Sequence, residues 1–200
     1  MTDVAHHDRD VVRAVDRLCE LTSIGAGHAA GALATLVGSP VEMCVPEARV
    51  LAPGEADAPL ASALGGDVRE WAGVLFQVDG GLGGTLGLLF PPASRERLLE
   101  KLLGENANIE PQAESALREV GNILASHALS AIGDMLGEIV LPSLPRLSME
   151  GAQHELARLI AANAGERAAL RIEVELCDRA RELRGLLVYA PARVDLARGL

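Results

Sequence analysis

Residues 16–36 of this 200-residue chain read D-R-L-C-E-L-T-S-I-G-A-G-H-A-A-G-A-L-A-T-L, and residues 115–135 read S-A-L-R-E-V-G-N-I-L-A-S-H-A-L-S-A-I-G-D-M. The second stretch repeats the first 99 residues later, so that Glu20 matches Glu119 and His28 matches His127. Self-similarity at a fixed spacing predicts two copies of one structural unit. The fold is therefore expected to consist of two related halves.

The spacing of 99 residues continues through most of the chain. It is kept at three further pairs of positions: Pro46 and Pro145, Phe90 and Tyr189, and Pro92 and Pro191. A two-fold repeat of this kind typically forms one globule in which equivalent sheets join and the long helices pack together. We therefore predict one domain over residues 1–200, made of repeats at about 11–104 and 110–200 and linked by residues 106–110.

Hydrophobic periodicity predicts the same order of elements in both halves. The two long helices are expected over residues 11–37 and 111–136. Shorter helices are predicted at 60–64, 91–103 and 153–162, and strands at 41–50, 72–78, 85–90, 139–149, 170–177 and 183–190. Prolines indicate an edge or a bulge in the first strand and break the equivalent strand of the second half.

The long helices have centres of small residues, which favours close packing between them. Gly25, Gly27 and Gly31 each lower helix propensity by about 1 kcal/mol relative to Ala, so we expect another backbone to approach there. Hairpins rather than crossover helices connect the strands, which favours antiparallel pairing. The predicted fold class is α/β of the α+β type, in which two long packed helices lie against a mainly antiparallel sheet with a pseudo-two-fold repeat.

Charge and composition argue against several classes of function. The net charge of −10 repels nucleic-acid backbones, and only four aromatic residues are available to stack on bases. No signal peptide and no apolar run of membrane-spanning length stands out, so we expect a cytoplasmic protein without membrane partners. Cys19, Cys44 and Cys177 are isolated in the sequence, which predicts small buried thiols in a reducing compartment and no metal site.

A polar stripe recurs in both long helices. Ser115, Glu119 and Asn122 stand at positions i, i+4 and i+7, so they share one face of the second helix. Gly121 leaves the neighbouring Asn122 amide unshielded. A lone E-x-x-N is most often a solvated surface, but an acidic or hydroxyl residue, a Glu and a small polar residue recur at identical spacing in both helices, which indicates a functional site. The equivalent residues of the first helix are Asp16, Glu20 and Ser23.

These residues resemble the CheC group of chemotaxis phosphatases, which includes CheX and FliY. The resemblance covers about residues 11–191 and rests on E-L-T-S-I-G-A-G-H-A-A, V-P-E-A, E-S-A-L-R-E-V-G-N-I-L-A-S, F-P-P and P-S-L-P at these intervals. It implies an enzyme whose substrate is a phosphorylated CheY-type response regulator carrying its own Mg²⁺. Glu119 would then pair with a lysine of the regulator, and Asn122 would orient the water that attacks the aspartyl phosphate.

The first copy of the stripe departs from the family pattern. Ser23 replaces the expected asparagine, and His28 replaces the asparagine that usually follows I-G-A-G. A serine hydroxyl is shorter than an amide and offers one oxygen, so we predict a degenerate first site in which Glu20 retains only docking. Ser115 and Asp16, at the heads of the two stripes, are assigned to docking, although a capping role in the first helical turn suits Ser115 equally well. No cofactor of the protein's own is expected.

The sequence also allows two functions other than a phosphatase. The chain would act as a non-catalytic module that sequesters a phosphorylated regulator, or that binds a CheD-like partner. A flagellar switch component of the FliY kind is disfavoured, because those proteins carry an additional domain. His28 and His127 occupy equivalent positions, where packing is favoured over a shared metal ion.

Overall fold

The computed structural model describes residues 2–60 and 64–193, and it contains four α-helices with the strands of one sheet. The α-helices are α1 (Thr2–Val37), α2 (Pro92–Leu103), α3 (Glu110–Leu136) and α4 (Ala152–Ala164), with 3-10 helices η1 (Val68–Glu70) and η2 (Gly104–Asn108). The strands are β1 (Val41–Met43), β2 (Glu47–Leu51), β3 (Ala72–Asp79), β4 (Gly84–Phe90), β5 (Leu141–Pro142), β6 (Arg146–Ser148), β7 (Ala169–Asp178) and β8 (Arg184–Ala190). The predicted helix 60–64 falls mainly on residues 61–63, outside the described residues.

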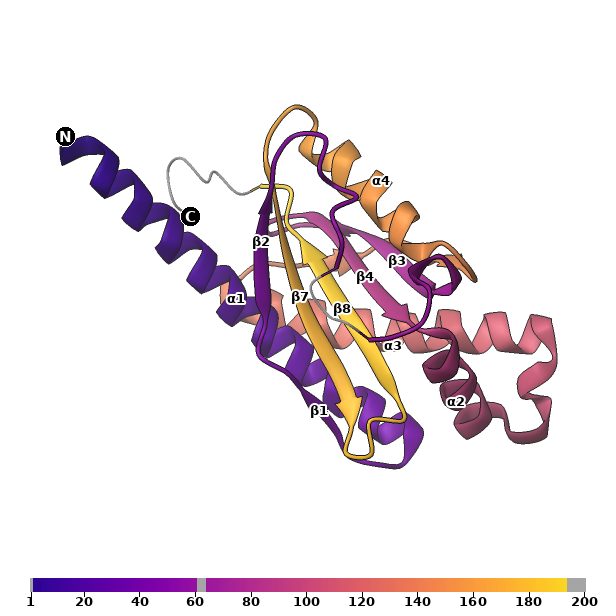
Figure 1. Ribbon diagram of the computed structural model, residues 1–200. Coiled ribbons are helices and arrows are strands. Elements are labelled where there is room, and N and C mark those ends of the chain that lie inside the picture. Colours follow the sequence, from indigo (N-terminus) through magenta and orange to yellow (C-terminus); the bar gives the residue numbers. More distant parts are fainter. Residues whose placement is uncertain (1, 61–63, 194–200) are drawn as a thin grey trace.

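The strands form a single antiparallel sheet in the order β1-β7-β8-β4-β3-β5 (Figure 1). β2 also pairs with β7, and β6 also pairs with β3. The hairpins β3–β4 and β7–β8 meet at the centre, where β4 lies beside β8. The predicted α+β architecture with an antiparallel sheet is therefore confirmed.

The repeat is visible in the register of the two central strands. Leu88 of β4 faces Leu187 of β8, and these two residues are separated by the repeat spacing. The pseudo-two-fold axis therefore passes between them. At the edges the halves exchange strands, because β1 and β2 of the first repeat pair with β7, while β5 and β6 of the second pair with β3. Each half thus completes the sheet of the other.

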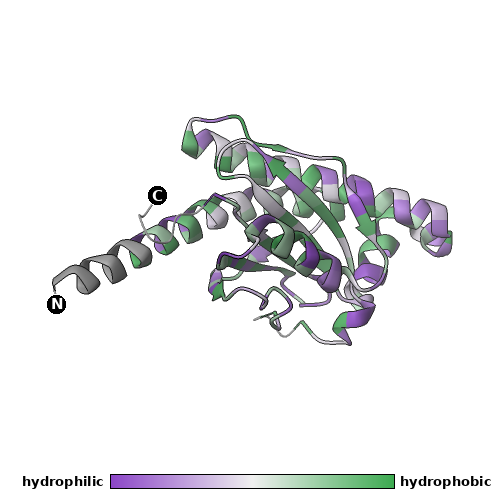
Figure 2. Cartoon of the chain, turned by 90° about the horizontal axis from the view of Figure 1, so that it is seen from above, coloured by the Kyte–Doolittle hydropathy of each residue, from purple (hydrophilic) through white to green (hydrophobic). Residues whose placement is uncertain are grey.

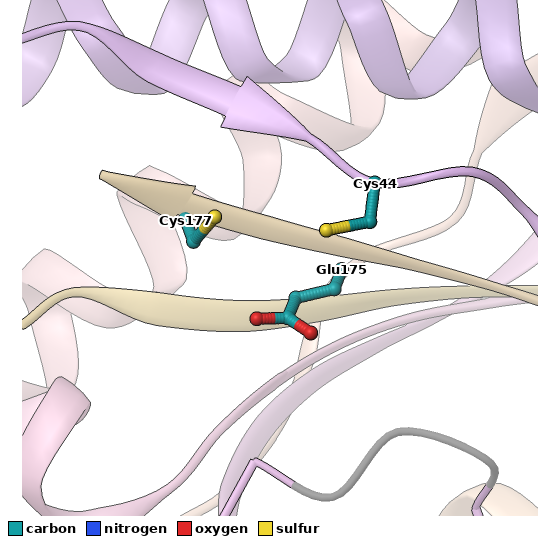
Figure 3. Close-up of side chains that lie close together, drawn as sticks. All are labelled: Cys44, Glu175 and Cys177. Carbon is teal, nitrogen blue, oxygen red and sulfur yellow. The ribbon is translucent and has the colours of Figure 1, made fainter. Parts of the chain in front are cut away.

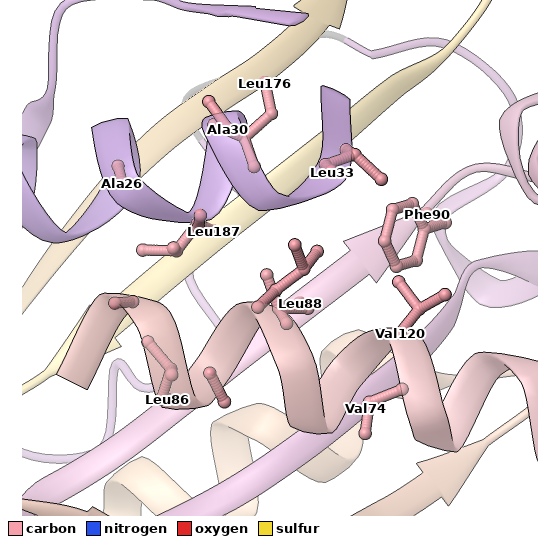
Figure 4. Close-up of a cluster of buried hydrophobic side chains, with 14 of the residues drawn as sticks. Ala26, Ala30, Leu33, Val74, Leu86, Leu88, Phe90, Val120, Leu176 and Leu187 are labelled. Atoms are coloured by element: carbon pink, nitrogen blue, oxygen red, sulfur yellow. The ribbon is translucent and has the colours of Figure 1, made fainter. Parts of the chain in front are cut away.

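Helices cover both faces of this sheet. α1 and α3 pack against each other on one face, whereas α4 contacts β3 and β4 on the other. Figure 4 shows Ala26, Ala30 and Leu33 of α1 and Val120 of α3 above the central strands. The strands are largely apolar, whereas polar and apolar residues alternate along the helices (Figure 2). This alternation fixes which side of each long helix is exposed.

The glycines in α1 serve different purposes. A Cβ at Gly25 would lie 2.9 Å from the Ala128 carbonyl oxygen and 3.0 Å from Ile132 Cδ1, which confirms the predicted close approach of α3. A Cβ at Gly27 would meet only Met43 Sδ, at 3.7 Å, and one at Gly31 would meet nothing within 4 Å. For these two positions the prediction of close backbone packing was wrong.

Several boundaries also differ from the prediction. The strand predicted over 41–50 is divided into β1 and β2, and the strand over 139–149 into β5 and β6. Pro46 and Pro145, which cannot donate to a ladder, lie at these interruptions. The predicted linker 106–110 is occupied by η2 and the start of α3, and α1 begins well before residue 11. The other predicted helices and strands agree within two residues.

Candidate functional site

The stripe on α3 lies on the outward side of that helix. The residues that α3 buries against α1 and the sheet include Leu117, Val120 and Leu124. Ser115 and Glu119 lie on the other side and are exposed, and Asn122 is half-buried. The helical periodicity that places apolar residues in the core therefore presents these three polar side chains together.

A very close contact with the sheet fixes the height of α3 at this stripe. A Cβ at Gly121 would lie 2.5 Å from Val74 Cγ1 and 2.7 Å from Val74 Cβ, so the helix backbone rests directly on β3. Gly121 is buried, and it serves this packing. The interpretation of Gly121 as a residue that leaves Asn122 unshielded was wrong, because its missing side chain would point into the core.

Glu119 and Asn122 of the stripe are available for an external partner. Across residues 12–60 and 64–193, neither the Glu119 carboxylate nor the Asn122 amide forms a hydrogen bond or ion pair within the protein. The adjacent Arg118 pairs instead with Glu114, at 3.0 Å between Nη1 and Oε2. Side chains at i and i+3 lie about 5–6 Å apart at their Cβ atoms. One acidic group and one amide can therefore contact the same bound surface.

The first copy has the same orientation with different chemistry. Asp16 and Glu20 are exposed on α1, and Ser23 is half-buried. Thr22 occupies the position equivalent to Gly121 and is buried, with its hydroxyl donating to the Leu18 carbonyl at 2.8 Å. The pKa of the Cys19 thiol is raised by burial and by the nearby Asp16 carboxylate. This stripe therefore presents carboxylates but no amide.

A groove separates the exposed sides of the two long helices near the pseudo-two-fold axis. Its volume is about 540 Å³, and its lining consists of Gly27, His28, Gly31, Ala32, Thr35, Leu36, Ile123 and His127. Ile123 directly follows Asn122, so the groove adjoins the second stripe. Both histidines are exposed. Neither belongs to a group of three or more potential metal ligands among the described residues.

One cluster of chemically reactive side chains was missed in the sequence. Cys44 and Cys177, read as isolated thiols, lie together with Glu175 at one edge of the sheet. The pairing of β1 with β7 brings them together from distant parts of the chain. Spacing in the sequence carried no signal for this arrangement, because the exchange of edge strands between repeats creates it.

In the described residues, no helix combines the length and the apolar character needed to cross a membrane.

The antiparallel sheet with its two long packed helices forms a fold that also occurs in chemotaxis and flagellar proteins. FliY of Thermotoga maritima superposes with a TM-score of 0.66 at 17% identity, covering 89% of this chain and 90% of that one. A chain of the CheX–CheY–BeF3–Mg²⁺ complex from Borrelia burgdorferi superposes with a TM-score of 0.57 at 14% identity, covering 84% and 96%. At these identities the likeness establishes the fold alone.

Sequence similarity then gives the family. The model of the CheC-like family matches residues 113–149, which include the α3 stripe. The CheY-P phosphatase CheC of Bacillus subtilis (strain 168) is 32% identical over 142 residues, or 68% of this chain. The chain belongs to the CheC-like family. It matches 66% of the length of that relative, just under two thirds.

Proposed function

We propose that this protein accelerates hydrolysis of the aspartyl phosphate of a CheY-type response regulator, with Glu119 docking the regulator and Asn122 orienting the attacking water. The observation that carries the proposal is that Glu119 and Asn122, on the exposed side of α3, have no hydrogen-bond or ion-pair partner within residues 12–60 and 64–193. A carboxylate without an internal partner is available for a cation of another protein. An amide one turn further along the helix can enter the site that this cation borders.

The comparisons support this choice of substrate. A relative with 32% identity is a CheY-P phosphatase, and a protein with this fold has been solved in complex with CheY, BeF3 and Mg²⁺. The family model also covers the α3 stripe rather than the stripe of α1. The first two observations support the class of substrate, and the third supports the choice of the α3 stripe as the proposed site.

The chemistry requires little from the protein. The water oxygen attacks phosphorus, the bond between phosphorus and the aspartate oxygen breaks, and inorganic phosphate and a free carboxylate result. The Asn122 amide can accept a hydrogen bond from the water and donate one to a phosphoryl oxygen. Correct orientation of the water lowers the barrier without a nucleophile or a general base from this protein. Mg²⁺ belongs to the regulator in this scheme, and the protein contributes no cofactor.

The decisive experiment measures multiple turnovers of a phosphorylated CheY-type receiver in the presence of Mg²⁺. Loss of a hydrogen bond worth about 1–3 kcal/mol corresponds to about 5- to 150-fold in rate, so Asn122→Ala is expected to reduce kcat by this amount. Glu119→Ala is expected mainly to raise KM, because it removes a docking contact. Both variants must retain the circular-dichroism spectrum and melting temperature of the unmodified protein.

Asp134→Ala is the matched control for Glu119→Ala. It removes an exposed carboxylate from the same helix, about four turns away, and should leave both constants unchanged. The proposal fails if folded Asn122→Ala turns over the receiver as fast as the unmodified protein. It also fails if Asp134→Ala raises KM as much as Glu119→Ala does, because net charge alone would then explain the effect.

A second candidate function is binding without turnover, and the stripe of α1 favours it. Asp16 and Glu20 are exposed there, but Ser23 supplies no amide. Such a surface would hold a phosphorylated regulator, or a CheD-like partner, without orienting a water molecule. Substoichiometric amounts of protein distinguish the two functions, because an enzyme depletes the phosphorylated receiver completely whereas a binding module protects only a stoichiometric fraction.

A further inference from the structure

Three potential metal ligands meet where β1 leaves the sheet. Cys44 directly follows β1, and its backbone N–H donates to the Glu175 carbonyl of β7 at 2.8 Å. Glu175 and Cys177 are two residues apart on β7, so their side chains lie on the same side of the sheet. Figure 3 shows the two sulfur atoms and the carboxylate in one neighbourhood. The Cys44 sulfur, the Cys177 sulfur and a Glu175 oxygen all lie within 4.8 Å of one another.

We propose that Cys44, Glu175 and Cys177 bind a thiophilic divalent cation of the zinc class. In tetrahedral zinc sites, Zn–S is about 2.3 Å and Zn–O about 2.0–2.2 Å, which places neighbouring ligand atoms roughly 3.5–3.8 Å apart. The ligand atoms lie within 4.8 Å of one another, which exceeds this by about 1.3 Å at most, a difference within reach of side-chain rotation. Two thiolates and one carboxylate suit Zn²⁺ far better than Mg²⁺ or Ca²⁺, which prefer oxygen alone.

The surroundings leave room for a fourth ligand. A cavity of about 40 Å³ adjoins the cluster and is lined by Cys44, Val45, Glu47, Glu173, Glu175 and Leu186. A water molecule needs about 10–15 Å³ measured in the same way. A bound water can therefore complete a tetrahedral shell of two sulfurs, one carboxylate oxygen and one water.

Arg184 contacts the Glu175 carboxylate of this cluster. Its Nε donates to Glu175 Oε1 at 2.8 Å, and its Nη1 donates to the Leu64 carbonyl at 3.4 Å. Carboxylate ligands are commonly held by such hydrogen bonds, which orient the ligand for the metal. The guanidinium also compensates charge, since two thiolates and a carboxylate around a divalent cation carry a net charge of −1. The arginine thus supports a metal site rather than displacing it.

The proposed metal site and the α3 stripe lie on opposite faces of the sheet. Val174 and Leu176 of β7 belong to the core beneath α1 and α3, so Glu175 and Cys177 point to the opposite face. Leu186, which lines the adjoining cavity, belongs to the core on the α4 side. Metal binding would join the edge strand β1 to β7 without blocking the stripe on α3.

The test uses the full chain, reduced with a phosphine and freed of metal by a chelator that is then removed. Zn²⁺ is titrated in competition with a chromophoric chelator, and Co²⁺ is added separately as a spectroscopic probe. We expect one equivalent of Zn²⁺ to bind, and Co²⁺ to give sulfur-to-cobalt charge-transfer bands with the visible bands of tetrahedral coordination. Cys44→Ser and Cys177→Ser should each weaken Zn²⁺ binding at least about tenfold, and Glu175→Gln should weaken it to a smaller extent.

Cys19→Ser is the matched control, because it removes a thiol of α1 that lies outside the cluster. It should bind Zn²⁺ as tightly as the unmodified protein. Each variant is first compared with the metal-free protein by circular dichroism and thermal melting; if Cys177→Ser is unfolded, the half-buried Cys44 decides the question. The proposal is overturned if reduced protein binds no Zn²⁺, if folded Cys44→Ser binds it with unchanged affinity, or if Co²⁺ shows only octahedral spectra.

Discussion

Gly121→Ala tests whether contact between α3 and β3 sets the position of the proposed catalytic amide. The added Cβ would lie 2.5, 2.7 and 2.9 Å from the three carbon atoms Cγ1, Cβ and Cγ2 of Val74, which is fully buried. Val74 is β-branched and has little rotamer freedom to yield. Overpacking of this kind costs about 1–3 kcal/mol, and the better helix propensity of Ala returns about 1 kcal/mol.

We therefore expect Gly121→Ala to lower the free energy of unfolding by up to about 2 kcal/mol. For a domain of this size, 1 kcal/mol corresponds to about 2–4 °C in melting temperature, so Tm should fall by up to about 8 °C. The backbone of α3 must also move away from β3, which shifts the neighbouring Asn122. Turnover of a phosphorylated receiver should consequently decrease at a temperature where the variant is fully folded.

Gly31→Ala provides the control, because it makes the same substitution inside a helix where the new Cβ would meet nothing within 4 Å. It should raise the free energy of unfolding by about 0.5–1 kcal/mol through helix propensity alone. Denaturant unfolding of both variants measures the difference. Equal stabilisation by Gly121→Ala and Gly31→Ala would refute the packing argument, as would unchanged turnover in a clearly destabilised Gly121→Ala protein.

Three further substitutions test other parts of the structure. Ser23→Asn in an Asn122→Ala background should restore receiver turnover if the first stripe lacks only its amide; no recovery would mean that its docking geometry differs as well. Arg171→Met should cost about 3–5 kcal/mol in denaturant unfolding, because it breaks the 2.8 Å ion pair with the buried Glu173 carboxylate and removes two hydrogen bonds to backbone carbonyls; a loss below 1 kcal/mol would contradict this. Tyr189→Phe, which copies Phe90 of the first repeat, should cost about 1 kcal/mol, since the buried hydroxyl donates to a loop carbonyl at 2.8 Å; an unchanged melting temperature would contradict that role.

Local patterns were sufficient to predict most elements of the fold. Gly38 and Gly137 occupy equivalent positions, and both adopt the left-handed conformation that ends a long helix. The hairpin connections predicted antiparallel pairing, and the repeat predicted that the sheets of the two halves join. The exchange of edge strands could not be predicted, because it depends on pairing between segments such as Val41 and Asp178, which are far apart in the chain.

The candidate site shows the same division between local and long-range information. Helical spacing was enough to place Glu119 and Asn122 on one exposed face, because the neighbouring apolar residues determine which side of α3 is buried. The purpose of Gly121 was misread, since its partner Val74 lies on a strand of the other repeat. The cysteine cluster was missed for an equivalent reason, as Cys44 and Cys177 meet only through the pairing of β1 with β7.

The crosswise sheet edges have a consequence for biosynthesis. When the ribosome has completed the first repeat, the outer edge of β3 is still without β5 and β6, and β1 and β2 have no β7 to pair with. Contacts of such long sequence separation form slowly, and strand edges promote aggregation until their partner strands pair with them. Nascent chains stalled after the first repeat should therefore be protease-sensitive and dependent on chaperones, and protection should appear only once β7 and β8 have left the exit tunnel.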